Sequence, residues 1–571
     1  MQQLLELDRC RPPSQHELQD QLRHIETPVR LSVWQEALAN HPDQSFAKYI
    51  LNGLKEGFRI GFNHKEAKLQ QGTHNMPCSN HKVVSEYLET ELNLNRLVKL
   101  SDREAALAGI HCSPIGIIPK KNKPGKWRLI VDLSSPEGAS VNDGVNKDMC
   151  SLSYTSVDVI TNKVLELGQG TLLAKMDIKQ AYRMIPVHPE DRYLLGMRWQ
   201  ETVFVDKTLP FGLRSAPLIF SAVADALQWT MQRNGATFVD HYIDDFITVG
   251  SPGTDECANN VAIMHHTCSE SGTPVEEEKS EGPATVLPFL GIEIDSIAME
   301  LRLPADKLKH LQQILGQWRG KKVCKKRDLQ SIIGSLSHAC KVVRSGRAFT
   351  RRLIDLAKLA KRPHHHVRLS REARSDIEWW YQFAGKWNGM SMLRAQRREK
   401  PDITLISDAS GTWGCGAFWD QKWFQLKWAG MLEQAHITIK ELVPIVLGAA
   451  VWGREWRGRT VHVWCDNSAV VAILNWGNSR DPEAMHLMRC LAFIKEKFQF
   501  FLFATHIKGK NNDLADALSR DNLSYFRSHH PQALPHPTPL PQELLDLTMI
   551  SKPDWTSAHW TDLWSAIFVV D

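Results

Sequence analysis

Apolar runs of strand length alternate with helical stretches along the chain, and Pro, Gly and polar residues mark the turns between them. The apolar runs at 115–118 and 129–131 flank a basic segment that contains Pro and Gly, which predicts a hairpin with a cationic tip. Residues 172–176 predict a strand that ends at Asp177, and residues 218–231 predict a helix. The hairpin tip and the strand end therefore place charged groups at the edge of an apolar core.

A second hairpin is predicted at 239–249, where two apolar arms with β-branched residues meet at Asp244 and Asp245. Neighbouring carboxylates at a tight turn repel each other unless a cation lies between them. The pair therefore suggests a metal site, although Asp-Asp is equally common in ordinary surface turns. The rest of the chain has to decide between these two interpretations.

From about 303 to 360 the chain becomes helical and basic. One cluster lies at 319–327, and arginines that follow recur at spacings of three and four, which predicts that they share one helix face. We interpret these residues as a surface for a polyanion, because the chain is otherwise near neutral; a solvated helix face is the alternative. The candidate contacts are Lys321, Lys322, Lys325, Lys326, Arg344, Arg347 and Arg351.

Residues 403–520 form a separate alternation of strands and helices. Strands are predicted at 403–407, 461–465 and 498–506, and helices near 438–453 and 482–497. The tail from 521 contains closely spaced prolines and predicts an extended linker, followed by a short aromatic segment with Trp555, Trp560 and Trp564.

Composition bounds the class of protein. The chain has 571 residues, of which 43% are hydrophobic and 23% charged, so it can build several domains with full cores. The net charge of +5 says little about partners. The 11 cysteines are dispersed without a C-x-x-C pair, and no apolar run reaches the roughly 18 residues of a membrane span. We therefore expect a soluble intracellular protein, cytoplasmic or nuclear, without membrane contact.

Asp177, Asp244 and Asp245 can be grouped as one set of carboxylates. Nucleotidyl transfer needs hard oxygen ligands for two Mg²⁺ (or Mn²⁺) ions, one that activates a 3′-hydroxyl and one that neutralises a triphosphate. Lys121 and Arg128 in the first hairpin suit the phosphates, Lys as a point charge and Arg through its planar fork.

Several segments occur in the order of the successive motifs of reverse transcriptases, and the ordered set is far more specific than any single member. They are Lys121…Trp127-Arg128, Asp177…Tyr182, Leu209-Pro210-Phe211-Gly212, Tyr242-Ile243-Asp244-Asp245 and Phe289-Leu290-Gly291. The resemblance covers about residues 60–360, and the fuller sequence of these segments looks most like the DIRS group of retrotransposons. It implies a right-hand polymerase with fingers, palm and thumb.

The resemblance also implies roles for individual residues. Asp177, Asp244 and Asp245 match the metal-binding triad, with the Ile178 carbonyl as an extra ligand. Lys121 and Arg128 match residues that grip the triphosphate, and Tyr182 matches the aromatic gate that excludes a 2′-hydroxyl. Phe211 and Gly212 complete the nucleotide site, with Phe211 where retroviral enzymes carry a glutamine. Lys279 matches the lysine that protonates pyrophosphate, although a surface turn beside Glu276–Glu278 is equally plausible.

A second carboxylate set lies in 403–520. Asp408 and Asp466 end predicted strands, Glu441 lies on a predicted helix, and Asp516 follows near the end of the region. Four converging carboxylates suit two Mg²⁺ (or Mn²⁺) ions that activate a water, and the set resembles the D-E-D-D pattern of ribonuclease H. Lys510 stands where the cellular enzymes carry a histidine, and His506 lies four residues earlier, so its role as a proton shuttle is open.

We therefore expect an α+β multidomain protein, a right-hand polymerase followed by a mixed-sheet α/β ribonuclease H-like domain. The expected divisions are an N-terminal helical extension (1–95), fingers and palm (96–300), a basic helical thumb or connection (301–400), the ribonuclease H-like domain (401–522), and a Pro-rich linker with an aromatic tail (523–571). The expected function is RNA-directed DNA polymerisation with degradation of the RNA of the hybrid. Expected partners are RNA template, DNA primer, RNA–DNA hybrid, deoxynucleoside triphosphates and other element-encoded proteins. The alternatives are a polymerase that makes RNA and a decayed or host-adopted copy that only holds RNA–DNA hybrid.

Overall fold

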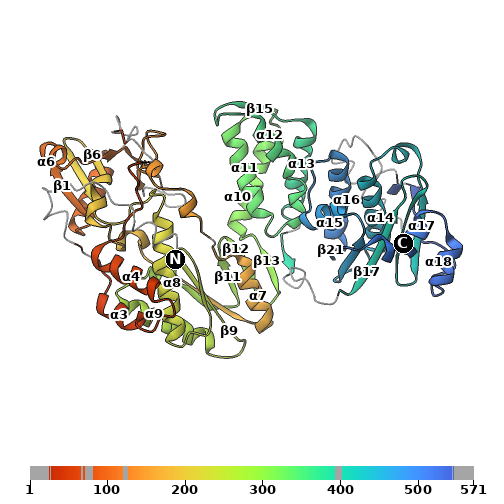
Figure 1. Cartoon of the computed structure of the whole chain (residues 1–571), viewed down its shortest axis with the longest axis horizontal. Helices are drawn as coiled ribbons and strands as arrows, with labels where there is room; N and C mark the ends of the chain where they lie inside the picture. Colours follow the sequence, from red (N-terminus) through yellow and green to blue (C-terminus); the bar gives the residue numbers. More distant parts are fainter. Residues whose placement is uncertain are drawn as a thin grey trace. The chain divides into compact units, whose positions relative to one another are not determined.

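The computed structural model describes residues 25, 27–65, 69–70, 81–119, 127–152, 154–386, 388–391, 401–542 and 544–545. The chain divides into two compact units, residues 1–289 and residues 290–571 (Figure 1). Each unit combines helices with β-sheets, which confirms the expected mixed α and β architecture. Among the described helices, none is both long and apolar enough to cross a membrane.

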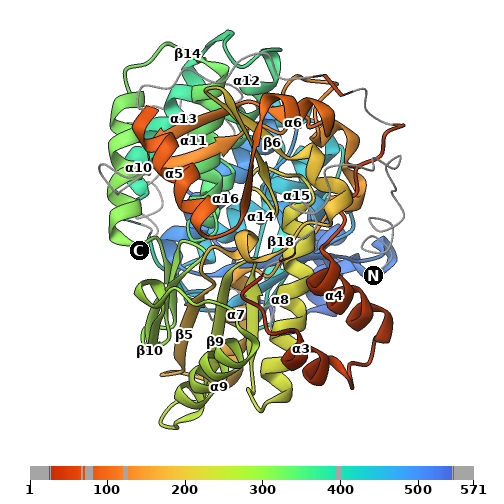
Figure 2. The same ribbon diagram turned by 90° about the vertical axis from the view of Figure 1, so that its left-hand side faces the viewer.

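An antiparallel sheet in the order β10-β5-β9-β8 is the centre of the first unit. Helices α7, α8 and α9 pack against it, and Figure 2 shows α8 and α9 beside β5 and β9. The buried side of α8 joins Met176, Ile178 and Phe246 in one apolar core. The elements are β5 (Leu172–Asp177), β8 (Val239–Tyr242), β9 (Asp245–Gly250), β10 (Glu281–Ala284), β11 (Val286–Phe289), α7 (Val157–Leu167), α8 (Ala216–Arg233) and α9 (Glu256–Ser271).

The N-terminal helices α3 (Leu31–Leu38) and α4 (Gln44–Glu56) share this core. The Trp34 indole donates to the Ser271 carbonyl at 3.2 Å, and α3 contacts both α8 and α9. Helices were expected in this region as an extension. The structure instead uses them to cover the apolar surface of α8 and α9.

The remaining strands of the first unit form two small sheets. One has the order β1-β7-β6-β2, and the other is the hairpin β3-β4, which confirms the strands predicted around 115–131. Lys121 and the predicted cationic tip at 120–126 lie outside the described residues. The elements are α5 (His81–Asn93), α6 (Asp102–Leu107), β1 (Leu97–Ser101), β2 (Cys112–Ser113), β3 (Ile115–Pro119), β4 (Trp127–Val131), β6 (Gly196–Trp199) and β7 (Thr202–Asp206).

The second unit begins with a helical region, in which α10–α13 are drawn in green in Figure 1. The ring of Phe349 stacks on Trp379 with centroids 3.8 Å apart, in a core that also buries Leu329, Leu336 and Trp380. The elements are β12 (Ile292–Asp295), β13 (Glu300–Arg302), β14 (Val323–Lys325), β15 (His366–Arg368), β16 (Met390–Ser391), α10 (Ala305–Trp318), α11 (Lys326–Ala339), α12 (Arg351–Leu359) and α13 (Arg371–Phe383).

The expectation that Arg344, Arg347 and Arg351 share one helix face is wrong. α11 ends at Ala339, Arg344–Arg347 form the 3₁₀ turn η6, and α12 begins at Arg351. Spacings of three and four place residues on one face only within a continuous α-helix. Here the turn folds against Trp380, whose ring lies so close to Gly346 that a Cβ atom would come within 2.2 Å of it.

The C-terminal part of the second unit is built on a mixed sheet in the order β19-β18-β17-β20-β21, antiparallel in the first three strands and parallel from β17 to β21. The helix α14 contacts β17, β18 and α16, and nearly all of its side chains are buried. The predicted strands and helices of this region are confirmed, except that the last strand begins at Phe501 and not at Phe498, which ends α16. The elements are β17 (Ile403–Ala409), β18 (Gly414–Trp419), β19 (Lys422–Lys427), β20 (Thr460–Cys465), β21 (Phe501–His506), α14 (Ile437–Trp452), α15 (Ser468–Trp476), α16 (Pro482–Phe498), α17 (Asp513–Ser519) and α18 (Leu523–His529).

Candidate active sites

The first carboxylate set forms where β5 pairs with β9. The register of these strands places Asp177 directly opposite Asp245, and Asp244 lies in the turn between β8 and β9. Ile243, the other turn residue, has a φ of 56°, which is an unfavourable conformation for a β-branched side chain. Such strain persists only where surrounding contacts hold it, and the Ile178 amide donates to the Asp244 carbonyl at 3.0 Å. The structure therefore brings the three predicted aspartates together.

Burial and mutual repulsion disfavour the charged forms of Asp244 and Asp245. Burial raises the pKa of Asp244, and the nearby Asp177 adds to the rise. Burial also raises the pKa of Asp245 to about 6, with further contributions from Asp244 and Asp177. Carboxylate oxygens in such a cluster are the ligands that Mg²⁺ and Mn²⁺ prefer, and a bound cation would relieve the repulsion. The donor set therefore fits a hard divalent metal.

Lys279 lies directly at this set. Its Nζ donates to Oδ1 of Asp177 at 2.8 Å. Burial opposes the ammonium charge, but the hydrogen bond and the charge of Asp177 outweigh it and raise the pKa of Lys279. The segment is fixed because the Glu276 amide donates to the Asp177 carbonyl at 2.8 Å. Lys279 is thus both part of the turn at 276–279 and a neighbour of the metal-binding candidates.

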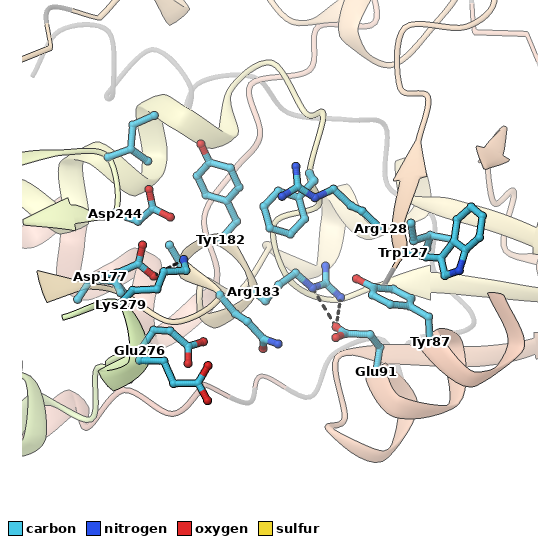
Figure 3. A pocket seen from close by; sticks show the side chains of 17 residues that line it. Tyr87, Glu91, Trp127, Arg128, Asp177, Tyr182, Arg183, Asp244, Glu276 and Lys279 are labelled. Carbon is cyan, nitrogen blue, oxygen red and sulfur yellow. Dashed lines mark hydrogen bonds and ion pairs between the residues drawn. The ribbon is translucent and has the colours of Figure 1, made fainter. Parts of the chain in front are cut away.

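These residues form one wall of a cavity of about 620 Å³. Figure 3 shows Asp177, Asp244 and Lys279 on one side, Tyr182 beside them, and Arg128 extending towards the middle from β4. The cavity therefore combines carboxylates, a guanidinium and aromatic rings. Its lining residues are Tyr87, Glu91, Trp127, Arg128, Leu129, Asp177, Ile178, Gln180, Ala181, Tyr182, Arg183, Phe211, Ile243, Asp244, Glu276, Glu278 and Lys279.

Tyr182 and Phe211 form the aromatic part of the cavity. Their ring centroids are 5.5 Å apart, and Phe220 contacts the other side of Tyr182 at 5.7 Å. Burial and the charge of Asp244 raise the pKa of Tyr182, so its phenol is neutral. Phe211 remains 43% exposed, in keeping with a residue that packs on a ligand. Gly212 has a φ of 97°, and a Cβ there would lie 3.1 Å from the Val131 carbonyl, so the turn requires glycine.

The second carboxylate set lies at the carboxyl ends of two inner strands of the sheet in the second unit. The parallel strands β17 and β20 bring Asp408 and Asp466 to the same end of the sheet, and α14 supplies Glu441. Oxygens of Glu441 and Asp466 lie within 4.8 Å of each other and of the Cys465 sulfur, so this group could hold a metal ion. A thiol is a poor partner for Mg²⁺, which prefers oxygen.

Burial dominates the electrostatics of this set. It raises the pKa of Glu441 to about 9, with added repulsion from Asp408 and Asp466. It raises the pKa of Asp408 to about 6, to which Asp466 and Asp516 contribute, while a 2.7 Å hydrogen bond from Ser519 opposes the rise. Asp408 is therefore close enough to Asp466 and Asp516 to feel their charges, and Glu441 feels those of Asp408 and Asp466.

Two further residues flank this second set. A ring nitrogen of His506 lies 2.9 Å from the Asp466 carbonyl oxygen, and Lys510 lies in the short turn Gly509–Asn511. Oδ1 of Asp516 accepts a 2.6 Å hydrogen bond from Nε of Arg520. His506 thus lies next to the set, although its contact is with the backbone.

The segment that carries the first site is similar to a known family of proteins. Residues 118–294 match the family described as "Reverse transcriptase (RNA-dependent DNA polymerase)". The chain contains a reverse transcriptase domain. The matched segment includes Asp177, Asp244 and Asp245, together with Tyr182 and Lys279.

Two polyproteins are similar over most of the chain. Polyprotein P3 of Commelina yellow mottle virus is 22% identical over 427 residues, which cover 71% of this chain and 20% of that protein. The Transposon Tf2-3 polyprotein of Schizosaccharomyces pombe is 22% identical over 438 residues, covering 72% of this chain and 29% of that protein. The chain thus spans less than a third of the length of these relatives.

Among solved structures, the "foamy viral protease-reverse transcriptase dRH in complex with ds DNA" has a TM-score of 0.49 at 15% identity, covering 84% of this chain and 83% of that one. The same type of protein in complex with an RNA/DNA hybrid has a TM-score of 0.45 at 14% identity, covering 83% of this chain and 62% of that one.

The predicted basic contacts lie in the second unit, outside the cavity of the reverse transcriptase domain. Several are engaged within the protein: Lys326 donates to the Ala360 carbonyl at 2.7 Å, and Arg351 donates to Asp355 at 3.0 Å. Lys321 lies over the Trp318 ring at 4.6 Å. Lys322 is exposed and Lys325 half-buried, so the nucleic-acid role of this group stays a prediction.

Sequence reasoning missed Glu91 and Arg183, which line the cavity. Arg183 interrupts the apolar run Ala181–Val187 next to Tyr182, and a charge inside an apolar run was a usable signal. Glu91 gave no such signal, because it is one of several glutamates on α5 and the sequence does not distinguish it from the others. Their pairing joins positions 92 residues apart.

The pKa of Glu441 predicts an unusual dependence of stability on pH. In the folded, metal-free protein the carboxyl keeps its proton up to about pH 9, whereas the ordinary value is 4.5. Because the folded state binds more protons in this window, the free energy of unfolding should fall as pH rises from about 4.5 to 9, by up to about 1.4 kcal/mol per pH unit. Glu441→Gln lacks this term, so its melting temperature in EDTA should exceed that of wild type by a margin that grows with pH. Parallel melting profiles from pH 5 to 9 would contradict the assignment.

Proposed function

We propose that the chain is an RNA-directed DNA polymerase with ribonuclease H activity, which copies retrotransposon RNA into DNA and degrades the RNA of the resulting hybrid. The observation that carries the polymerase part is the facing of Asp177 and Asp245 across β5 and β9, with Asp244 in the adjacent turn of the same cavity. The reverse transcriptase domain match over 118–294 supports it. We assign this sheet and its helices to the palm, and β3-β4 with α5 to the fingers.

Asp177, Asp244 and Asp245, with the Ile178 carbonyl, would hold two Mg²⁺ or Mn²⁺ ions. When bound, these ions supply activation of the primer 3′-hydroxyl and neutralisation of the triphosphate. Arg128, which lines the cavity, would bind the triphosphate, and Lys121 is assigned the same role from the sequence. Lys279, whose Nζ lies 2.8 Å from Oδ1 of Asp177, would deliver a proton to the departing pyrophosphate.

Tyr182 would select the sugar. Its ring is held between Phe211 and Phe220, so it cannot turn aside for a 2′-hydroxyl without disturbing packed neighbours. A polymerase that makes RNA would need this space open. The packing of Tyr182 therefore favours a polymerase that makes DNA over one that makes RNA.

Tyr182→Ala should raise the efficiency of ribonucleotide incorporation relative to deoxyribonucleotide by roughly one to two orders of magnitude, because it removes the steric block. Single-nucleotide primer extension gives kcat/KM for each nucleotide and checks the ratio. Tyr381→Ala is the matched control, because it makes the same change at an exposed tyrosine of the second unit. An unchanged ratio in Tyr182→Ala would remove Tyr182 from sugar selection.

The second set would cut the RNA strand. Asp408, Glu441, Asp466 and Asp516 suit two Mg²⁺ or Mn²⁺ ions. Their positions on β17, on α14, directly after β20 and on α17 support a ribonuclease H-like arrangement. Both substrates of the chain would then be nucleic acids: an RNA template with a DNA primer, and the RNA–DNA hybrid. The DIRS group is the subgroup that we favour from the sequence.

The deciding experiment is primer extension on an RNA template with deoxynucleoside triphosphates and Mg²⁺, Mn²⁺ or EDTA. We expect extension with either metal and none in EDTA. The alternative, a decayed or host-adopted copy, would bind RNA–DNA hybrid but neither extend the primer nor cut the RNA. Hybrid binding measured in the same preparation separates that outcome from an unfolded protein.

A further inference from the structure

The turn that carries Tyr182 is anchored by a buried ionic cluster. Arg183 donates to Oε2 of Glu91 from Nε at 3.0 Å and from Nη2 at 2.7 Å, and its Nη1 lies 2.7 Å from Oδ1 of Asp206. The three side chains are 4% or 5% exposed. Glu91 comes from α5 and Asp206 from the end of β7, so one guanidinium ties the turn to two other elements. Figure 3 shows the contact between Arg183 and Glu91.

A second contact holds the other side of the same turn. Gln180 has a φ of 52°, and its side-chain oxygen accepts a 2.5 Å hydrogen bond from Nη1 of Arg96. The same Arg96 nitrogen lies 3.5 Å from Oε1 of Glu91. Tyr182 therefore lies between Gln180 and Arg183. Arg183 binds the Glu91 carboxylate on α5 directly, and Gln180 is linked to the same carboxylate through Arg96.

Arg183 also contacts the turn that carries the partner ring. Its Nη1 lies 3.5 Å from the Leu209 carbonyl, two residues before Phe211, and the Ile185 carbonyl accepts the Leu209 amide at 3.0 Å. Arg183 is thus next to Tyr182 in the sequence and contacts the backbone two residues before Phe211. Burying an ion pair of this kind costs free energy. It fixes the position of the turn, because the planar guanidinium directs each N–H donor at one acceptor.

We propose that Arg183, held by Glu91 and Asp206, is a positioning residue that sets the Tyr182 ring against the sugar and so determines the selection of deoxyribose over ribose. The inference rests on the proposed polymerase function. Arg183 touches no reacting atom; it acts through Tyr182 and Phe211. Loosening it should therefore change which sugar is accepted more than how fast the correct nucleotide is joined.

The test compares Arg183→Lys with a matched buried arginine. Arg59 makes a similar fork with Asp191 at 3.0 Å and 2.9 Å and is not among the described residues that line the cavity. Lysine keeps the charge in both variants but loses the fork. We expect Arg183→Lys to lower the ratio of deoxyribonucleotide to ribonucleotide kcat/KM about tenfold, with a smaller change in kcat for deoxyribonucleotide, whereas Arg59→Lys stays within about twofold of wild type.

A double variant completes the test. If Arg183 acts through Tyr182, adding Arg183→Lys to Tyr182→Ala should change the ratio no further; additive losses would overturn the proposal. Equal effects of Arg183→Lys and Arg59→Lys would overturn it too. Should Arg183→Lys fail to fold, Arg96→Met, whose side chain is 16% exposed, tests the same anchor. A wild-type protein that extends no primer would instead refute the proposed function itself.

Discussion

Primer extension should fall about a thousandfold or more in Asp244→Asn, a loss of about 4 kcal/mol of transition-state stabilisation. The amide keeps the size of the side chain but removes the charge that a divalent ion needs. Because Asp244 is buried in a cluster that raises its pKa, the metal-free protein should not be destabilised by the change. Steady-state extension with saturating Mg²⁺, together with a melting curve, checks both halves of this expectation.

Asp240→Asn supplies the control for this variant. Asp240 lies on β8 of the same hairpin, accepts a 2.5 Å hydrogen bond from Thr155, and is not among the described residues that line the cavity. The same chemical change there should leave extension within about twofold of wild type, as expected for a site without a chemical role. Cleavage of RNA–DNA hybrid should survive Asp244→Asn. If one substitution removed both activities from a folded protein, the assignment of two separate sites would be wrong.

The acidic centre of the first site could be predicted because its determinants are local. Strand ends and a tight turn are visible as apolar runs that stop at Asp177, Asp244 and Asp245. Pairing of β5 with β9 then follows from ordinary antiparallel geometry, and it sets Asp177 opposite Asp245. The anchor at Arg183 is different, because Glu91 and Asp206 approach it only through the packing of α5 and β7.

The basic region shows where periodicity misleads. Arg347 and Arg351 have helical spacing, but Arg347 ends η6 and Arg351 begins α12, and between them Phe349 stacks on Trp379. Tertiary packing of aromatic side chains outweighs the small free energies that favour a continuous helix. A pattern of charges alone carries no information about that packing.

In the proline-containing tail, the structure has a packed helix where the sequence predicted none. An extended linker was expected from 523, but α18 packs Phe526 into a core with Phe418 and Trp423. The chain after α18 also contacts the sheet, because the Trp423 indole on β19 donates to the Leu534 carbonyl at 2.8 Å. Prolines remove backbone donors and disfavour helix, but they do not prevent extended chain from packing on a sheet. The aromatic segment at 555–564 lies outside the described residues.

Hybrid cleavage should fall about a thousandfold in Asp466→Asn, while primer extension remains within about twofold of wild type. Asp466 directly follows β20, and its carboxylate lies within 4.8 Å of that of Glu441, so the amide removes a charged oxygen from the group that could hold a metal. Asp466 is only half-buried, so its loss should leave the fold intact. A labelled RNA–DNA hybrid, followed by gel electrophoresis in Mg²⁺, measures the cleavage directly.

Asp481→Asn is the matched control for Asp466→Asn, because Asp481 caps α16 through hydrogen bonds from Glu483 and Ala484 at 2.9 Å, a role that asparagine also fills. Cleavage should be unchanged in that control. Cleavage that persists in Asp466→Asn at the wild-type rate would refute a ribonuclease H site at Asp408, Glu441, Asp466 and Asp516. Since the two sets of acids belong to separate compact units, the paired results of Asp244→Asn and Asp466→Asn also test whether each unit carries its own chemistry.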